Sequence, residues 1–465
     1  MTDFASLLRP DRGGSAHAIH LVDKAGFGAW LKKQSPARRA LIEAARFEGK
    51  TGFQYLVLPT GEGHEWDVVS TVANAAELSP WCIARLAEVL PEGTYRLADG
   101  DPGPATLGWL LGQHRLNDYR SKVEDQRGAR ILLTSEAAEI EPTVRLAEAT
   151  ALVRDLVDTP AADLGPAELE TAARDLAKAH GAKVEVTSGD ALEQGFPMIA
   201  AVGQGAARER APRLIELYWG KDGAPRVAIV GKGVCFDSGG LDIKPASGMR
   251  LMKKDMGGAA HALALGRLIM AERLPVRLHL LIPAVENSVS AASYRPGDVL
   301  GSRKGIKVEI DNTDAEGRLI LGDALAKAGE GDPELIIDFA TLTGAARVAL
   351  GPDLPALFAN DDELAASLEG AAKAVTDPAW RMPLWDGYDE MLKSDLADLA
   401  NAADSPMAGA VTAALFLRRF VPEGTSWAHF DTFAWRPSAK PGRPKGGDAM
   451  GLRATFAMLK QRYSS

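Results

Sequence analysis

The chain has 465 residues, of which 46% are hydrophobic and 25% are charged, and its formal net charge is −9. This length predicts about two or three domains, and the composition is typical of a soluble globular protein. The acidic balance argues against a dedicated nucleic-acid-binding protein, and no apolar run is long enough to span a bilayer, so no membrane contact is expected.

The first part of the chain carries few chemical signals. Residues 1–140 mix short apolar runs with helical stretches and many Gly and Pro residues, which predicts a smaller α/β domain. Residues 141–158 have helical spacing, and the Thr-Pro pair that follows should end that helix. We expect residues 141–184 to form a linker helix and the entry to a second domain, which spans 185–465.

Buried strands and helices are expected to alternate in the second domain. The strand-like runs are residues 226–230, 277–285, 307–310 and 334–340. The helical runs between them include residues 259–274 and 318–330. Strands that alternate with crossover helices predict an α/β/α sandwich whose sheet is mixed but largely parallel.

Polar side chains follow three of these four strands, and another precedes a helix. In open α/β sheets, ligands bind beyond the carboxyl ends of the strands. The polar residues expected near this edge are Lys232, Asp237, Lys244, Asp255, Asp314, Glu316 and Arg318. We therefore predict a functional site in which they converge.

The four carboxylates of this group point to metal binding. Close together without counter-charge, they would repel one another and some would protonate, whereas a pair of divalent cations removes that cost. Asp314 and Glu316 would share one face if the chain continued extended after residue 310. Alone, such a pair is more often a turn or a helix cap, as is Asp255 before its helix.

Other catalytic motifs are absent. Phe236 stands where a dinucleotide-binding GxGxxG motif needs its third glycine, and there is no GxxxxGK[ST] or GxSxG sequence. The usual zinc spacings of His and Cys are missing as well. Cys235 is interpreted as packing rather than as a nucleophile, and two cysteines in all suit a cytoplasmic protein. Four further side chains are expected to be structural, as core or interface residues: His261, His429, Trp380 and Trp385.

Several sequence blocks resemble one family. The octapeptide NTDAEGRL (312–319) is similar to the signature of the leucine aminopeptidases, also called cytosol aminopeptidases or peptidase family M17. VGKGVCFDSGGLDIKP, MKKDMGGAA, YRPGDVL, ATLTGA and AGAVTAALFLRRFV resemble further blocks of that family, in its order. The resemblance covers residues from about 150 to 465.

The resemblance implies roles for the candidate residues. The implied ligands of two divalent metal ions, Mn²⁺ or Zn²⁺ with Mg²⁺ or Co²⁺ as alternatives, are Lys232, Asp237, Asp255, Asp314 and Glu316. The implied catalytic residues are Lys244 and Arg318, with a bicarbonate ion near Arg318. The implied substrate-binding residues are Met252, Asn312, Ala315, Thr341, Leu342 and Gly344.

The implied function is hydrolysis of the N-terminal peptide bond of peptides with a free N-terminus and an apolar first residue such as Leu. A water that bridges the two metal ions would attack. The family also implies a cytoplasmic homohexamer and a role in assembly for the N-terminal domain. Two alternatives remain open: a two-metal amidase or phosphoesterase, and a catalytically silent relative that acts as a binding or scaffold protein.

Two segments depart from the family pattern. Cys235 takes a place often held by a small or hydroxyl residue. The tail around Ala449 and Met450 differs from the family's, which leaves the C-terminal wall of the substrate pocket open.

Overall fold

The computed structural model describes residues 2–50, 52–60, 65–116, 118–121 and 128–464. The chain divides into two compact units: residues 1–151 with 438–445, and residues 152–437 with 446–465. The division falls within α5 (Ile140–Asp158), the helix expected to link two domains. None of the helices in the described part has the length and apolar character that a membrane span requires.

The N-terminal unit is a six-stranded sheet covered by helices. Its strands are β1 (Leu8–Pro10), β2 (His17–Val22), β3 (Tyr55–Pro59), β4 (Trp66–Thr71), β5 (Gly93–Leu97) and β6 (Arg130–Thr134). Its helices are α1 (Phe27–Lys32), α2 (Pro36–Ala44), α3 (Ala84–Val89) and α4 (Ala105–Leu111). The strand order is β1-β6-β5-β2-β4-β3, and neighbours run parallel except β3 and β4. Tyr95 and Trp109 are fully buried in its core.

A late segment of the chain completes this unit. Residues 438–445 belong to it although they follow the large sheet in sequence. The amide of Gly442 donates to a carboxylate oxygen of Glu88 at 2.7 Å, and the Arg443 guanidinium lies 4.5 Å from the Trp81 ring centroid. The Pro/Gly/Lys-rich composition of this segment predicts a loop but does not indicate where it packs.

The C-terminal unit contains a nine-stranded mixed sheet. Its strands are β7 (Lys183–Ser188), β8 (Arg213–Trp219), β9 (Arg226–Gly231), β10 (Gly233–Asp237), β11 (Arg277–Asn287), β14 (Leu335–Ala340), β15 (Ala356–Ala359), β16 (Trp380–Arg381) and β18 (Ser426–Asp431). The order is β16-β15-β18-β14-β9-β11-β8-β7, with β10 paired to β11. Strands β9, β10, β11, β14 and β18 are mutually parallel, whereas β8 and β15 run antiparallel to their inner neighbours. The α/β fold with a mixed sheet is therefore confirmed.

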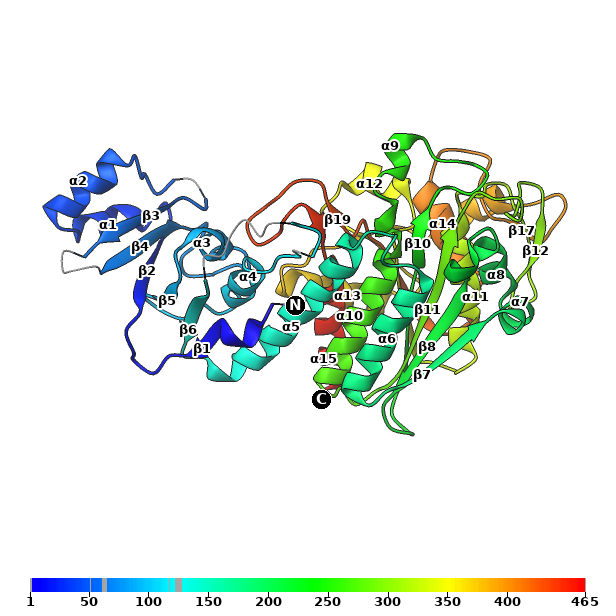
Figure 1. The fold of residues 1–465 in the computed structure, drawn as a ribbon, viewed down its shortest axis with the longest axis horizontal. Coiled ribbons are helices and arrows are strands. Elements are labelled where there is room, and N and C mark those ends of the chain that lie inside the picture. Colours follow the sequence, from blue (N-terminus) through cyan, green and yellow to red (C-terminus); the bar gives the residue numbers. More distant parts are fainter. Residues whose placement is uncertain (1, 51, 61–64, 117, 122–127, 465) are drawn as a thin grey trace. The chain divides into compact units, whose positions relative to one another are not determined.

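Helices cover both faces of this sheet (Figure 1). On one face lie α6 (Pro166–His180), α10 (Gly257–Ala271), α13 (Asp362–Ala374) and α15 (Leu452–Tyr463). On the other lie α7 (Asp190–Gly195), α8 (Pro197–Gly203), α11 (Glu316–Gly329) and α14 (Gly409–Arg418). α10 is apolar nearly all round because it packs against both the central strands and α15. The predicted helices 259–274 and 318–330 correspond to α10 and α11.

One predicted strand belongs elsewhere. Residues 307–310 form β13 (Lys307–Glu309), which pairs with β12 (Val299–Gly301) and β17 (Leu399–Ala400) in a separate three-stranded sheet. The expectation that this strand lies in the large sheet is therefore wrong. An apolar run predicts a strand, but its short length and its partners are set by long-range packing that the run itself does not encode.

Candidate active site

The polar residues gather where the parallel strands of the large sheet end. Lys232 follows β9, Asp237 is the last residue of β10, and Thr341 follows β14. Strands β11 and β18 end at the same edge with Asn287 and Asp431. The carboxyl edge of an open α/β sheet is the usual place for a ligand, and here five strands bring polar groups to it.

Asp255 enters the site from a 3₁₀ turn, η4 (Met252–Met256), that precedes α10. It is not the N-cap of α10, a position that Met256 occupies. Its Oδ1 accepts a hydrogen bond from the Thr341 hydroxyl at 2.8 Å. α10 can begin this close to the sheet because Gly258 has no side chain: a Cβ there would lie 2.1 Å from the Phe339 carbonyl oxygen.

The local geometry of Asp314 and Glu316 differs from the extended arrangement predicted for them. Asp314 lies in a turn, and Glu316 is the first residue of α11. The two carboxylates do not share the face of a strand. The helix N-terminus is a favourable place for Glu316 because the helix dipole and unpaired N–H groups attract negative charge. The turn is held in part by the Asp314 amide, which donates to Asn312 Oδ1 at 2.7 Å.

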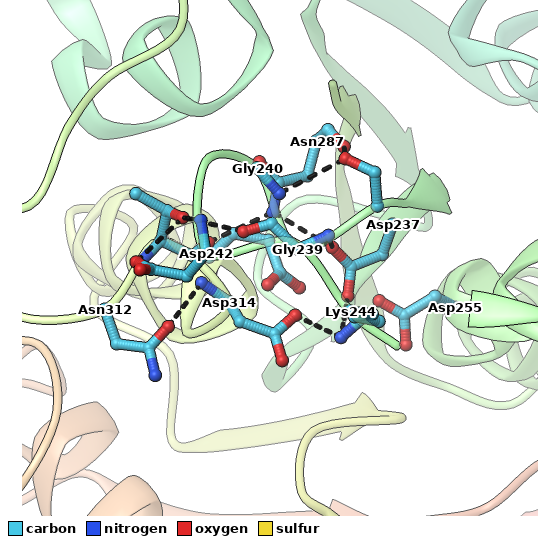
Figure 2. A network of polar contacts seen from close by, with 12 residues as sticks. Asp237, Gly239, Gly240, Asp242, Lys244, Asp255, Asn287, Asn312 and Asp314 are labelled. Atoms are coloured by element: carbon cyan, nitrogen blue, oxygen red, sulfur yellow. Dashed lines mark hydrogen bonds and ion pairs between the residues drawn. The ribbon is translucent and has the colours of Figure 1, made fainter. Parts of the chain in front are cut away.

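Two lysines bridge the four carboxylates. Lys232 Nζ lies 2.7 Å from Asp255 Oδ2 and 2.9 Å from Glu316 Oε1. Lys244 Nζ lies 2.7 Å from Asp237 Oδ2 and also pairs with Asp314, so that it stands between these two carboxylates (Figure 2). The two lysines therefore supply counter-charge to all four carboxylates, so repulsion among the carboxylates does not by itself require metal ions.

The same residues fit divalent cations. One carboxylate oxygen from each of Asp237, Asp255 and Glu316 lies within 4.8 Å of the others, and all three side chains are buried. Within the described part of the chain, Glu316 Oε2 has no hydrogen-bond partner. Burial, followed by the charge of Asp237, raises the pKa of Glu316 to about 8. A buried carboxylate oxygen without a donor next to two further carboxylates is typical of a site for hard cations.

The other two carboxylates respond differently to the site. Burial, with the negative charge of Asp237, raises the pKa of Asp314 above its usual value. Burial also raises the pKa of Asp255, but Lys232 and Lys254 lower it more, to about 2. Asp255 is thus ionised, which suits a metal ligand.

Two residues that support the site belong to none of the sequence motifs. Asn287 Nδ2 donates to Asp237 Oδ1 at 2.9 Å and to the Thr313 carbonyl at 3.0 Å (Figure 2). Asp431 accepts from the amides of Leu342 and Thr343 and orders the loop after β14. Both residues end parallel strands, so applying the strand-edge rule to every parallel strand would have found them.

Arg318 lies in the first turn of α11 and is buried. Its guanidinium donates to the Asn401 carbonyl at 2.7 Å and lies 6.0 Å from the Phe416 ring centroid. Burial lowers the pKa of Arg318 to about 10, which leaves it charged at neutral pH. It therefore offers a fixed positive charge to the site.

A single hollow of about 450 Å³ connects these groups. Its lining includes all seven predicted metal-binding and catalytic residues: Lys232, Asp237, Lys244, Asp255, Asp314, Glu316 and Arg318. It also includes all six predicted substrate-binding residues: Met252, Asn312, Ala315, Thr341, Leu342 and Gly344. Ala449 and Met450 are not among its lining residues, and the Met450 amide instead donates to His261 Nε2 at 3.0 Å.

Three of the residues interpreted as structural are buried and take no part in the cluster of carboxylates and lysines. Cys235 is buried, and burial raises the pKa of its thiol well above the usual range, so no reactive thiolate forms. His261 and His429 are buried, with ring nitrogens 2.7 Å from the Gly257 carbonyl and 2.5 Å from Asp338 Oδ1.

The two tryptophans near residue 380 are not core residues. Trp380 is 60% exposed and Trp385 is 61% exposed. The core alternative is therefore wrong for both, and their role at an interface stays a prediction. The run that contains them is apolar enough to resemble a core segment, but β16 is a two-residue edge strand that buries neither indole.

Known proteins resemble this chain over most of its length. Residues 151–456 match the family model "Cytosol aminopeptidase family, catalytic domain", and residues 18–133 match "M17 aminopeptidase, N-terminal domain". A probable cytosol aminopeptidase of Roseiflexus castenholzii is 39% identical over 93% of this chain and 95% of that protein. The structure of a cytosol aminopeptidase from Coxiella burnetii superposes with a TM-score of 0.92 at 46% identity, covering 98% of this chain and 99% of that one.

A second solved structure names a metal. The bottromycin maturation enzyme BotP in complex with Mn superposes with a TM-score of 0.85 at 32% identity, covering 96% of this chain and 100% of that one. The family models together match most of the chain, and the similarity extends over the full length of these relatives. The chain therefore belongs to the cytosol aminopeptidase family, M17, a family of metal-dependent enzymes that hydrolyse peptides.

Proposed function

We propose that the protein removes the N-terminal residue from peptides that carry a free α-amine, with a dinuclear metal site at the edge of the large sheet. The observation that carries the proposal is the convergence of four carboxylates and two lysines in one hollow, from three stretches of the chain (232–244, 255 and 314–316). A scaffold protein has no need to bury this much charge, which is costly unless it is paired or binds metal.

The proposed metal ligands are Lys232, Asp237, Asp255, Asp314 and Glu316. When bound, two divalent ions supply Lewis-acid polarisation of the scissile carbonyl and activate the water that attacks it, which we propose lies between them. Burial lowers the pKa of Lys232, but Asp255 and Glu316 raise it more, so it stands above its usual value. Lys232 therefore has to release a proton before its amine can serve as a ligand.

Lys244 is proposed to stabilise the negative charge that develops on the carbonyl oxygen. Burial lowers its pKa, but Asp237, Glu316 and Asp314 raise it more, so the amine remains an ammonium. A permanently charged donor suits electrostatic stabilisation and does not suit a general base. The Lys244 side chain is also 13% exposed at the hollow, within reach of a bound peptide.

Arg318 is proposed to hold a bicarbonate ion, which supplies the general base. The guanidinium uses one nitrogen on the Asn401 carbonyl, and a guanidinium has five N–H donors in all. Arg318 lines the hollow, and the carboxylates that line it as well are assigned to metal ions. No other side chain of the NTDAEGRL segment is free for proton transfer.

The substrate proposals concern the first residue of the peptide. Its α-amine would bind one of the metal ions held by the proposed ligands, and a blocked N-terminus would therefore not be accepted. Met252 and Leu342 give the hollow an apolar wall, so we propose that it accepts side chains such as that of Leu. Each methylene added to or removed from that side chain should change the transition-state binding free energy by about 1–3 kcal/mol. We further propose that the enzyme acts in the cytoplasm as a homohexamer, and that its N-terminal domain helps assembly.

Cleavage of a blocked and an unblocked substrate tests the proposal. Leu-p-nitroanilide should be hydrolysed in the presence of Mn²⁺, whereas N-acetyl-Leu-p-nitroanilide should not. Equal cleavage of both would contradict capture of the free amine and favour a general two-metal amidase. Cleavage of neither would favour a silent relative.

A further inference from the structure

Lys254 is a buried ammonium with little compensation. It is 1% exposed, and in the described part of the chain its Nζ makes no hydrogen bond. Its ion pair is with Asp255 Oδ1 at 3.5 Å, although Asp255 is already engaged by Lys232 at 2.7 Å. A buried cation is costly unless it is paired and hydrogen-bonded. Lys254 could therefore form a hydrogen-bonded ion pair with an anionic ligand.

A second cation lies beside the same aromatic ring. Arg347, on α12 (Gly344–Leu350), has its guanidinium 4.9 Å from the Phe433 ring centroid, and Lys254 Nζ is 5.5 Å from that centroid. Among the described residues, the Arg347 side chain forms no hydrogen bond or ion pair. A guanidinium remains charged in any protein environment. Two cations thus lie beside one ring. The carboxylate next to Lys254 is shared with Lys232, and Arg347 has none among the described residues.

Both cations line the hollow that contains the candidate active site. Lys254 adjoins Asp255, a proposed metal ligand, and lies two residues from Met252. Arg347 follows Gly344 by three residues, on the first turn of the helix that begins there. Met252 and Gly344 are proposed to contact the peptide. The side chain of the first residue leaves the peptide one bond from the α-amine, so a subsite beside the metal ligands is within its reach.

We propose that Lys254 and Arg347 form the charged end of the subsite that holds the side chain of the N-terminal residue. The subsite then accepts glutamate and rejects lysine and arginine, while its apolar wall still accepts leucine. This inference rests on the proposed aminopeptidase function. A carboxylate would give both cations the charge-assisted hydrogen bonds that they lack, whereas a basic side chain would place a third cation beside them.

Aminoacyl p-nitroanilides test the inference because they have no C-terminal carboxylate. Values of kcat/KM would be measured for the Leu, Glu, Gln and Lys anilides, with the wild type, Lys254→Met and Arg347→Met. The kcat/KM for the Glu anilide should exceed that for its isostere Gln by about tenfold or more, which corresponds to the free energy of one charge-assisted hydrogen bond. The Lys anilide should have the lowest kcat/KM. Each variant should reduce the Glu/Gln ratio of kcat/KM severalfold, and the value for the Leu anilide reports any change in overall activity separately.

Lys253→Met is the matched control. Lys253 is adjacent in sequence, but its Nζ donates to the Asp158 carbonyl and the residue does not line the hollow. This variant should keep the wild-type Glu/Gln ratio. Because Lys254 is buried and its replacement could disturb folding, melting temperature and Mn²⁺ content would be checked, and the partly exposed Arg347 variant gives a second measurement.

The outcomes separate the inference from the function on which it rests. If Leu-p-nitroanilide is cleaved but Glu is no better than Gln, or if neither variant changes that ratio, the charged subsite is wrong and the aminopeptidase proposal stands. If no anilide is cleaved at all, both proposals fail.

Discussion

Replacement of Asn287 by leucine should weaken metal binding more than it weakens the fold. Asn287 Nδ2 donates to Asp237 Oδ1 at 2.9 Å and to the Thr313 carbonyl at 3.0 Å. The Thr313 carbonyl keeps the hydroxyl of Tyr294 at 2.7 Å, so the loss falls mainly on Asp237. Removal of one hydrogen bond to a charged group costs about 1.5–3 kcal/mol. Residues that orient metal ligands typically contribute 10–100-fold in metal affinity, which corresponds to about 1.4–2.7 kcal/mol and agrees with that figure.

The effect on the fold should be smaller for a structural reason. Asn287 Oδ1 has no hydrogen-bond partner in the described part of the chain, so leucine removes a buried polar atom that is not satisfied. That gain offsets part of the lost stability. We therefore expect a Kd for Mn²⁺ about 10–100-fold weaker, with a modest decrease in Tm of the metal-free protein.

Competition with a chelating dye would measure the Mn²⁺ affinity, and calorimetry would measure Tm. The control is Tyr294→Phe, which removes a hydrogen bond from the Thr313 carbonyl but no contact with Asp237. That variant should keep its Mn²⁺ affinity within about threefold of the wild type, because the Asp237 carboxylate keeps its donor. Wild-type affinity in Asn287→Leu, or equal losses in both variants, would refute the reasoning.

Three further predictions, made with four variants, test separate parts of the structure. Lys244→Met should lower kcat by about 10²–10³, as does loss of an oxyanion donor, with near-normal metal content; loss of both ions in that variant would overturn its catalytic role. Asp448→Asn should destabilise the protein to urea by about 3–5 kcal/mol, because Asp448 accepts buried hydrogen bonds from both Arg154 and Arg436. Burial raises the pKa of Asp448 but the two arginines lower it more, so its contribution is present above a pH of about 3.9 and is lost as pH falls through the lowered pKa; an unchanged acid transition in the variant would contradict this. Gly258→Ala should lower the free energy of unfolding by at least about 1–3 kcal/mol through overpacking. Gly370→Ala, in open space on α13, should raise it by about 0.5–1 kcal/mol. Similar melting temperatures for these two variants would contradict the close approach of α10 to the sheet.

The central strands could be predicted from the sequence because they are continuously apolar and buried on both faces. Residues 226–230, 277–285 and 334–340 carry this pattern, and the structure places them in β9, β11 and β14. Periodicity also indicated α5, α10 and α11 within a few residues. The ends of these strands then located the site, because parallel strands bring their carboxyl ends to one edge.

What the sequence did not reveal depends on contacts between distant residues. The strand at 307–310 pairs with residues near 399 rather than with the large sheet, and Glu316 begins a helix rather than extending a strand. Lys254 carries no signal in the local sequence that separates it from Lys253, and its burial beside Phe433 is set by the fold. Local patterns describe which elements form, whereas burial and partner choice are set by the whole fold.

The metal stoichiometry tests the central claim most directly. Protein purified without chelator would be dialysed against Mn²⁺, and bound metal per chain would be counted for the wild type and for Glu316→Ala. The account predicts two ions per wild-type chain and fewer than two in the variant, because Glu316 contributes a buried oxygen that has no other partner in the described structure. A wild-type chain that binds no ion, or a Glu316→Ala variant that retains two, would contradict the dinuclear site.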